Sequence, residues 1–147
     1  TTPQDQVNEC TVAELPDGRL ILNMRNYDRT QKTRKISYSD DGGERWSDLQ
    51  SVETLPEPIC QASILFSHIN EKLYFLNPAD AENRVKMTLK SSTDSGLSWK
   101  TEEIFHAGPS AYSDLTLINK TTLGCLFEAG EFSAYEGIVF TKFEIKD

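Results

Sequence analysis

The sequence predicts an all-β fold, and three features of the chain lead to that expectation. Short runs of β-branched and aromatic residues recur about every ten residues and are bounded by Gly, Pro, Asn and Asp, which is typical of strands and turns. Helical periodicity is hard to find in any segment. One motif also occurs twice at a fixed distance, as repeated β architectures require.

The first four expected strands form one group. Thr11–Glu14 and Arg19–Arg25 flank a Pro-Asp-Gly turn, in which the glycine can adopt a positive φ. Thr33–Ser39 follows after a polar loop. Asp41, Gly42 and Gly43 then mark a tight turn before Trp46–Val52.

Seven further strands follow, and each is a β-branched, aromatic or aliphatic run that ends at a turn signal. A second group of four ends in a hairpin whose turn contains Ser95 and Gly96. The last group contains three. In order, the seven strands are Ala62–Ser67, Lys72–Asn77, Val85–Ser91, Trp99–Phe105, Tyr112–Ile118, Leu123–Phe127 and Gly137–Phe143.

The repeated motif reads Ser-x-Asp-x-Gly-x-x-Trp and spans the turn between the third and fourth strands of a group. The aspartate can accept hydrogen bonds from backbone N–H groups, the glycine allows a bend closed to other residues, and the tryptophan folds back as an apolar plug. The aspartates are therefore interpreted as structural and not catalytic. The residues are Ser39, Asp41, Gly43 and Trp46, repeated as Ser92, Asp94, Gly96 and Trp99.

The grouping of four, four and three strands predicts a β-propeller, because its repeat is close to the length of a propeller blade. In a closed propeller, the strand missing from the last group is supplied by the other end of the polypeptide. The strand count therefore predicts that the chain is the later half of a propeller whose earlier blades are not in this sequence. A flattened stack of sheets that tolerates three blades is the alternative.

Length and composition agree with one folded domain. The chain has 147 residues, of which 37% are hydrophobic and 10% aromatic, and this is too apolar for a disordered acidic tail. No apolar run approaches the roughly 18 residues that span a bilayer. The first six residues lack the basic and apolar regions of a signal peptide, so we expect any targeting segment to have been removed or never to have existed.

Charge and cysteine content exclude several partners. The formal net charge of −8 argues against nucleic acid, because phosphate binding needs a basic face. An anionic small molecule can still bind where a few arginines converge. Cys10, Cys60 and Cys125 are odd in number and widely spaced, so we interpret them as buried or inert thiols and expect no metal site and no cofactor.

The repeated motif resembles the Asp-box, or bacterial neuraminidase repeat, and further segments resemble bacterial-type exo-α-sialidases. Asn8-Glu9, followed by Leu15 to Arg25, is similar to the segment that carries a catalytic Glu and the second arginine of a carboxylate-binding triad. Asn83-Arg84 matches the third arginine. Ala111 to Leu115 resembles the nucleophile segment, with Tyr112 as the nucleophile. Gly124 to Glu128 is similar to the strand whose Glu supports the first arginine.

This resemblance implies a six-bladed propeller that hydrolyses terminal sialic acid from glycoconjugates with retention of configuration. The Arg-Ile-Pro segment with the first arginine, and the Asp that acts as general acid/base, are not found in the chain. Residues 1–147 therefore look like the C-terminal half of the catalytic domain, with approximate blades 9–54, 60–106 and 110–147. We expect the isolated chain to be inactive or nearly so.

The resemblance also implies partners and a compartment. Sialylated glycans are the expected ligands, and either the missing N-terminal half of the propeller or another copy of the chain is expected to cover the open blade edges, which are pairing templates. Secreted or periplasmic location follows from the resemblance alone.

The chemistry of these residue types fits that assignment. A carboxylate substrate needs a planar, always-charged donor, which Arg25 and Arg84 supply. A neutral phenol avoids repulsion by the substrate carboxylate, and Tyr nucleophiles are a known property of sialidases among glycosidases. The free phenol is a weak nucleophile at neutral pH, so a base such as Glu9 must take its proton. Glu128, among apolar neighbours, requires a cation, and without the first arginine it is expected to pair with Arg84 or to have a raised pKa.

Residue chemistry alone leaves other interpretations open. Tyr112 can be an aromatic residue that packs at a blade edge, and Glu9 can be a solvated acid in a loop. Arg25 and Arg84 can be solvated strand residues that pair with acidic side chains. Tyr27, Tyr38, Tyr74 and Tyr135 are equally available nucleophiles. The remaining arginines considered, which are interpreted as surface charge, are Arg19, Arg29, Arg34 and Arg45. A non-catalytic Asp-box module that binds glycans or proteins is the alternative function.

Overall fold

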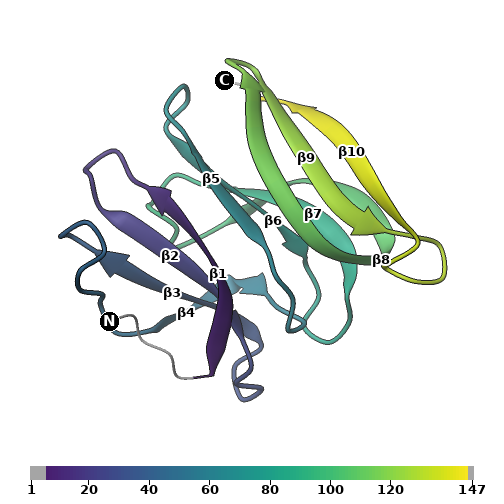
Figure 1. Cartoon of the computed structure of the whole chain (residues 1–147), viewed down its shortest axis with the longest axis horizontal. Coiled ribbons are helices and arrows are strands. Elements are labelled where there is room, and N and C mark those ends of the chain that lie inside the picture. Colours follow the sequence, from purple (N-terminus) through teal and green to yellow (C-terminus); the bar gives the residue numbers. More distant parts are fainter. Residues whose placement is uncertain (1–5, 146–147) are drawn as a thin grey trace.

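The computed structural model describes residues 6–145 and contains ten β-strands (Figure 1). Within this range there is no helix, and so none that is long and apolar enough to cross a membrane. The ends of the expected domain, residues 1–5 and 146–147, lie outside the described residues. The strands are β1 (Val7–Glu14), β2 (Leu20–Asn26), β3 (Thr33–Ser39), β4 (Gln50–Pro56), β5 (Ser63–Ser67), β6 (Lys72–Pro78), β7 (Val85–Ser92), β8 (Lys100–Asn119), β9 (Thr122–Ala129) and β10 (Gly137–Glu144).

The strands form antiparallel meanders in two sheets. One sheet has the order β1-β2-β3-β4, and the other has the order β10-β9-β8-β7-β6-β5. Figure 1 shows the strands fanning out from β1–β4, through β5–β7, to β8–β10. All-β architecture is therefore confirmed, and within each sheet every strand pairs with its sequence neighbour, as the closely spaced turn signals require. Strands β4 and β5 do not pair, and the chain passes between the two sheets there.

Strand β8 differs from the expectation. Two strands were expected over residues 99–105 and 112–118, but β8 runs without interruption through Gly108 and Pro109. Its first half pairs with β7 as far as Pro109, and its second half, from Ser110, pairs with β9. Proline lacks the N–H that a ladder requires, but an extended proline is compatible with a strand where the ladder partner changes. Residues 6–145 therefore contain ten strands and not eleven.

The two repeated motifs fold identically in their hydrogen bonding. In both, the serine hydroxyl accepts from the glycine N–H at 2.9–3.0 Å, and the aspartate accepts from the backbone N–H four residues later at 2.9 Å. In both, the indole N–H of the tryptophan donates to the glycine carbonyl at 2.9 Å. Hydrogen bonds from the backbone N–H and the guanidinium of Arg45 lower the pKa of Asp41 to about 2, so this carboxylate serves the turn.

The first repeated motif ends in a loop that sequence patterns did not indicate. Ser47 donates its N–H to the carbonyl of Tyr38 at 2.8 Å, and its carbonyl accepts from the hydroxyl of Ser37 at 2.6 Å. Both polar backbone groups of Ser47 are therefore hydrogen-bonded to β3, and β4 begins only at Gln50. The expected strand Trp46–Val52 was therefore placed too early, while the positive φ expected at Gly18, Gly42, Gly43 and Gly96 is confirmed.

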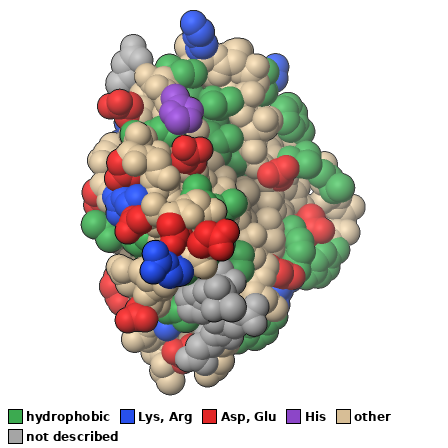
Figure 2. Space-filling model, turned by 60° about the vertical axis from the view of Figure 1, so that its left-hand side comes forward, with side chains coloured by type: hydrophobic (Ala, Val, Ile, Leu, Met, Phe, Trp, Pro, Cys, Tyr) green, Lys and Arg blue, Asp and Glu red, His purple; other side chains and the backbone are tan. Residues whose placement is uncertain are grey.

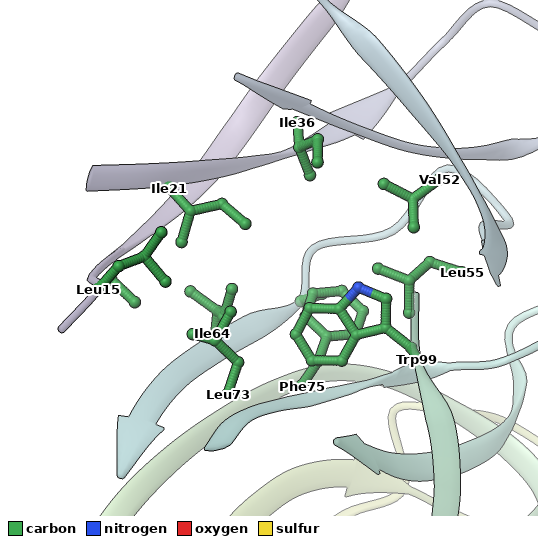
Figure 3. Packing of buried hydrophobic residues seen from close by; sticks show 11 residues of the cluster. Leu15, Ile21, Ile36, Val52, Leu55, Ile64, Leu73, Phe75 and Trp99 are labelled. Carbon is green, nitrogen blue, oxygen red and sulfur yellow. The ribbon is translucent and has the colours of Figure 1, made fainter. Parts of the chain in front are cut away.

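Two large hydrophobic cores lie between the strands, and a small third cluster contains Cys60, Ala111 and Ala134. The first joins β2, β3 and β4 to β5 and β6, and Trp99 packs into it with its ring 5.5 Å from that of Phe75 (Figure 3). The second joins β6 and β7 to β8, β9 and β10. Trp99 is buried, whereas the equivalent Trp46 is only half-buried, so the plug role expected for both tryptophans applies fully to one. Acidic and hydrophobic side chains share the face shown in Figure 2, in line with the net charge of −8.

Candidate active site

Four of the residues singled out from the sequence lie together. The hydroxyl of Tyr112 donates to Glu9 Oε1 at 2.6 Å, although 103 residues separate them in the chain. Arg25 Nη1 donates to the other carboxylate oxygen of Glu9 and lies 3.4 Å from the Tyr112 hydroxyl. The Arg84 guanidinium carbon lies 5.9 Å from the centre of the Tyr112 ring. A phenol, a carboxylate and two guanidinium groups therefore form one cluster.

Glu9 lies on a distorted part of β1. The register between β1 and β2 shifts between Asn8 and Thr11, which marks a β-bulge. Glu9 itself has a φ of 41°, in the left-handed region that residues other than glycine rarely adopt. Such backbone strain is concentrated at functional sites, because the surrounding structure must maintain it. Here the bulge directs the carboxylate to Tyr112 and Arg25.

The two arginines are held by different means. The Arg25 side chain is only 11% exposed, and its guanidinium lies 4.8 Å from the centre of the Tyr27 ring. Arg84 donates to the hydroxyl of Tyr135 at 2.7 Å and to the carbonyl of Ile59 at 2.8 Å. Ile59 has a φ of 57°, which is rare for a β-branched residue and orients this carbonyl. Neither Tyr135 nor Ile59 was among the predicted site residues.

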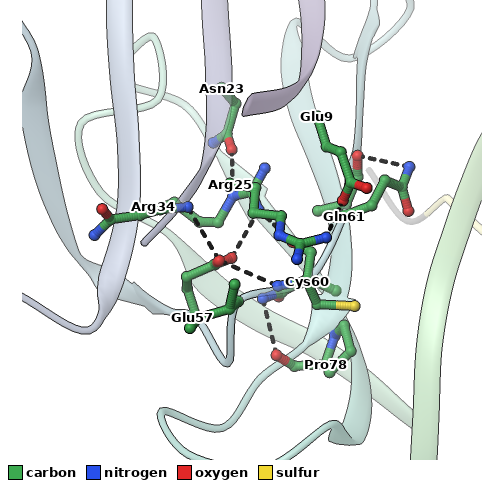
Figure 4. Close-up of polar contacts among 12 residues, drawn as sticks. Glu9, Asn23, Arg25, Arg34, Glu57, Cys60, Gln61 and Pro78 are labelled. Carbon is green, nitrogen blue, oxygen red and sulfur yellow. Dashed lines mark hydrogen bonds and ion pairs between the residues drawn. The ribbon is translucent and has the colours of Figure 1, made fainter. Parts of the chain in front are cut away.

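A buried ion pair lies next to Arg25, as Figure 4 shows. Arg34 Nη1 is 2.7 Å from Glu57 Oε2, and both side chains are fully buried. Neutral groups add to the pair, since Arg34 also donates to Asn23 Oδ1 at 2.7 Å and to the Cys60 carbonyl at 2.6 Å. The interpretation of Arg34 as surface charge is therefore wrong. Its position in β3 puts it on the same face as the core residue Ile36.

The other three arginines interpreted as surface charge have different environments. Arg45 is 90% exposed in its side chain, and Arg19 forms an exposed pair with Asp17, as expected. Arg29 is half-buried and donates to the carbonyls of Glu57 at 3.0 Å and Ala81 at 2.5 Å, so its role is to join two loops.

The cysteines are free thiols. Cys60 and Cys125 are buried and Cys10 is exposed. Burial raises the pKa of Cys60 to about 11 and that of Cys125 to about 12, so both remain protonated and are poor nucleophiles at neutral pH. Cys60 lies close to the arginines of the site, but its chemistry there is that of a small apolar side chain.

The protonation states favour Glu9 as a base. Partial burial alone would raise the pKa of Glu9, but hydrogen bonds from Tyr112 and Arg25 outweigh it and lower this pKa below its ordinary value. The pKa of Tyr112 is raised, chiefly because its hydroxyl donates to the Glu9 carboxylate. Over a wide pH range, the site therefore holds a carboxylate next to a neutral phenol. The phenol can become nucleophilic by transferring its proton during attack and not by prior ionisation.

This assignment predicts the direction in which the Tyr112 pKa moves when the base is changed. In the Glu9→Gln variant the acceptor loses its charge, while Arg25, which favours the phenolate, remains. We expect the Tyr112 pKa to be lower in this variant than in the wild type. An NMR titration with tyrosine labelled at the phenolic carbon measures it, with the signal assigned by its loss in Tyr112→Phe and with the Tyr74 signal as internal control. An unchanged or higher Tyr112 pKa would contradict the assignment.

Glu128 does not form the contact expected from the sequence. No ion pair between Glu128 and Arg84 occurs among residues 6–145; instead, Glu128 Oε2 accepts the backbone N–H of Tyr112 at 3.0 Å. This carboxylate therefore supports the backbone of the candidate nucleophile. Beside it lies an open cleft of about 350 Å³, lined by Gln61, Tyr112, Ser113, Asp114, Leu126, Phe127, Glu128 and Ile138.

Comparisons with known proteins show the family to which the chain belongs. Residues 1–125 match the family described as "BNR repeat-like domain". A sialidase of Micromonospora viridifaciens is 33% identical over 132 residues, which are 84% of this chain and 20% of that protein. A sialidase of Bacteroides fragilis is 32% identical over 149 residues, which cover 95% of this chain and 26% of that protein.

A solved structure shares the fold. The structure of the Hadza microbial sialidase Hz136 is similar with a TM-score of 0.82 and 31% sequence identity, over 95% of this chain and 28% of that one. The all-β architecture with curled sheets therefore fits a propeller of this type. The chain spans between a fifth and about a quarter of the length of the two curated relatives.

Proposed function

Because the chain belongs to the BNR-repeat family of bacterial-type sialidases, we propose that it supplies the nucleophile side of the active site of an exo-α-sialidase. The observation that carries this proposal is the contact of the Tyr112 hydroxyl with Glu9, at 2.6 Å, beside two arginines. The substrate class is terminal sialic acid on glycoconjugates, and the reaction is hydrolysis with retention of configuration.

The proposed mechanism gives a role to each of the four residues. Arg25 and Arg84 bind the sialic acid carboxylate, so that the anomeric carbon faces Tyr112. The phenol oxygen attacks that carbon as its proton passes to Glu9 Oε1, and the bond to the aglycone breaks as the aglycone oxygen takes a proton from an acid outside this chain. Water then attacks the anomeric carbon of the glycosyl-tyrosine and gives a proton to that same outside group, while Glu9 returns the phenolic proton to the Tyr112 oxygen as its bond to the sugar breaks. Two displacements at one carbon give retention.

We propose that this site is completed outside the chain. In this proposal the acid that protonates the leaving aglycone and the first arginine of the triad lie outside residues 1–147, because no Arg-Ile-Pro segment occurs there and the relatives are about four to five times as long. The open face of the last sheet supports this, because Ile118, Leu126, Ile138 and Phe140 are exposed there. In this proposal residues 1–147 form three blades of a six-bladed ring, with boundaries near 9–54, 60–106 and 110–147. The isolated chain is then inactive towards natural sialosides.

Ligand binding tests whether Arg25 and Arg84 form the carboxylate clamp, that is, the pair of arginines that holds the substrate carboxylate. This test does not require turnover. We expect the chain to bind 2-deoxy-2,3-didehydrosialic acid, and Arg84→Met to weaken this binding about 10- to 100-fold, since hydrogen bonds to charged groups contribute about 1.5–3 kcal/mol. Arg25→Met should act in the same way. Isothermal titration calorimetry measures the affinities.

Two controls show whether a loss of affinity is specific to the arginines of the clamp and to the carboxylate of the ligand. Arg19→Met removes an exposed arginine far from the cluster and should leave the affinity unchanged. The methyl ester of the same ligand lacks the negative charge and should bind weakly, with no further loss in Arg84→Met. Affinity for the free acid that does not change in either clamp variant would contradict the proposal and favour a non-catalytic Asp-box module.

A further inference from the structure

The candidate nucleophile lies where the β8–β9 ladder is interrupted. Ser110 pairs with Ala129, and the next pair is Ser113 with Phe127. Three steps along β8 therefore face two steps along β9, which is a β-bulge at Ala111 and Tyr112. On its other side, β8 pairs with β7 only as far as Pro109. The Ser110 N–H still donates to the carbonyl of Arg84, just before β7, at 2.8 Å. Beyond Ser110, the backbone polar groups have no strand neighbour on this edge of β8 within the described residues.

One side chain takes the place of the missing strand. Gln61, in the segment between β4 and β5, accepts the backbone N–H of Ser113 with Oε1 at 2.9 Å. Its Nε2 donates to the carbonyl of the same residue at 2.9 Å, and also to the carbonyl of Ala62 at 3.0 Å. A neutral amide is the side-chain group that offers a donor and an acceptor together, as a paired strand does. Gln61 thus fixes both polar backbone groups of the residue that follows Tyr112.

We propose that Gln61 is a positioning residue, which holds the Tyr112 phenol against Glu9 by fixing the backbone of Ser113. This inference rests on the proposed role of Tyr112 as nucleophile. The phenol needs such a restraint, because Tyr112 is 38% exposed and belongs to no hydrophobic core. Two backbone anchors flank its side chain: Glu128 holds the Tyr112 N–H, and Gln61 holds the next peptide groups.

The expected effect of losing this anchor is large for reactivity and small for binding. A misplacement of about 1 Å costs on the order of a hundredfold in rate. Arg25 and Arg84 do not contact Gln61 through any hydrogen bond of the described residues, so the carboxylate clamp keeps its own supports. A change in Gln61 should therefore separate the rate of covalent reaction from ligand affinity.

The experiment compares the wild type with Gln61→Met, which keeps the length of the side chain but removes the amide. The probe is a 3-fluorosialosyl fluoride, whose fluoride leaves without protonation. We expect covalent modification to be about 10- to 100-fold slower in Gln61→Met, with the affinity for 2-deoxy-2,3-didehydrosialic acid changed by less than about twofold. Gln61→Asn keeps the amide on a shorter side chain, so its rate of covalent modification should lie between those of the wild type and Gln61→Met. Gln50→Met, at the exposed start of β4, is the matched control and should react like the wild type.

A second measurement decides the inference independently of the sialidase assignment. A phenol released from Glu9 should have a lower pKa than in the wild type, so the NMR titration of Tyr112 should shift downward in Gln61→Met. An unchanged phenol pKa together with an unchanged rate overturns the inference. If the wild type itself forms no adduct, the proposed function fails, and the Tyr112 titration alone then decides: a lower pKa supports Gln61 as the anchor, and an equal one overturns it.

Discussion

Replacing Tyr112 with phenylalanine is expected to remove the reaction of the chain with a 3-fluorosialosyl fluoride, with a loss of about a thousandfold or more. Fluoride is a good leaving group and needs no general acid, so a chain without that acid can still be glycosylated. The fluorine at carbon 3 disfavours the oxocarbenium-like transition state of hydrolysis, which lets the adduct accumulate. Fluoride release and the mass of the intact protein give the rate and the yield.

The substitution removes only the phenol oxygen, because the phenyl ring can keep its place 5.9 Å from the Arg84 guanidinium. Tyr38→Phe is the matched control, since the Tyr38 hydroxyl donates to the Ser95 carbonyl at 2.8 Å, away from the cluster. This variant should react like the wild type. Tyr112→Phe protein that is modified as fast as the wild type would show that another group is the nucleophile.

Replacing Arg34 with methionine should lower the free energy of unfolding by about 3–5 kcal/mol. Arg34 and Glu57 are both fully buried and 2.7 Å apart, so the substitution leaves a carboxylate in the interior without its cation. Glu57 Oε1 also accepts the backbone N–H groups of Asn26 and Cys60, at 3.1 and 3.2 Å, which fixes the carboxylate in place. It therefore cannot move to solvent without breaking those contacts. Urea unfolding measures the loss.

Two comparisons isolate the buried charge. Lys32→Met breaks an exposed pair with Glu82 and should cost no more than about 1 kcal/mol. The double variant Arg34→Met, Glu57→Leu removes both charges and should recover much of the loss, as replacement of buried ion pairs by apolar residues does. If Arg34→Met is no more destabilising than Lys32→Met, the ion pair does not hold the fold in the way described.

Much of the fold could be predicted from local patterns, because strands and tight turns depend on neighbouring residues. The two Ser-x-Asp-x-Gly-x-x-Trp motifs indicated hairpins, and both have the same hydrogen bonds. The exceptions depend on contacts with neighbouring strands. Gly108 and Pro109 look like a break, but β7 and β9 pair with the chain before and after them. The start of β4 depends on Ser47, which contacts residues of β3.

The candidate site could be predicted where its residues belong to a family motif. It could not be predicted where a residue acts by contacting a partner far away in the sequence. Tyr112, Glu9, Arg25 and Arg84 were identified by resemblance, and they lie together. Gln61 had no signal, because a side chain that binds a backbone 52 residues away leaves no local pattern. The same holds for Tyr135, whose hydroxyl accepts from the Arg84 side chain 51 residues away. Arg34 did have a signal in the sequence. Side chains alternate between the two faces of β3, so Arg34 lies on the same face as Ile36, and its burial could have been inferred.

The most direct test is where the fluorosugar becomes attached. Peptide mapping by mass spectrometry of the wild-type chain, after exposure to the 3-fluorosialosyl fluoride, should find the sugar on the peptide that contains Tyr112, bonded to its phenol oxygen. Attachment to another residue, or no attachment to a folded chain that binds the didehydro ligand, would contradict the account.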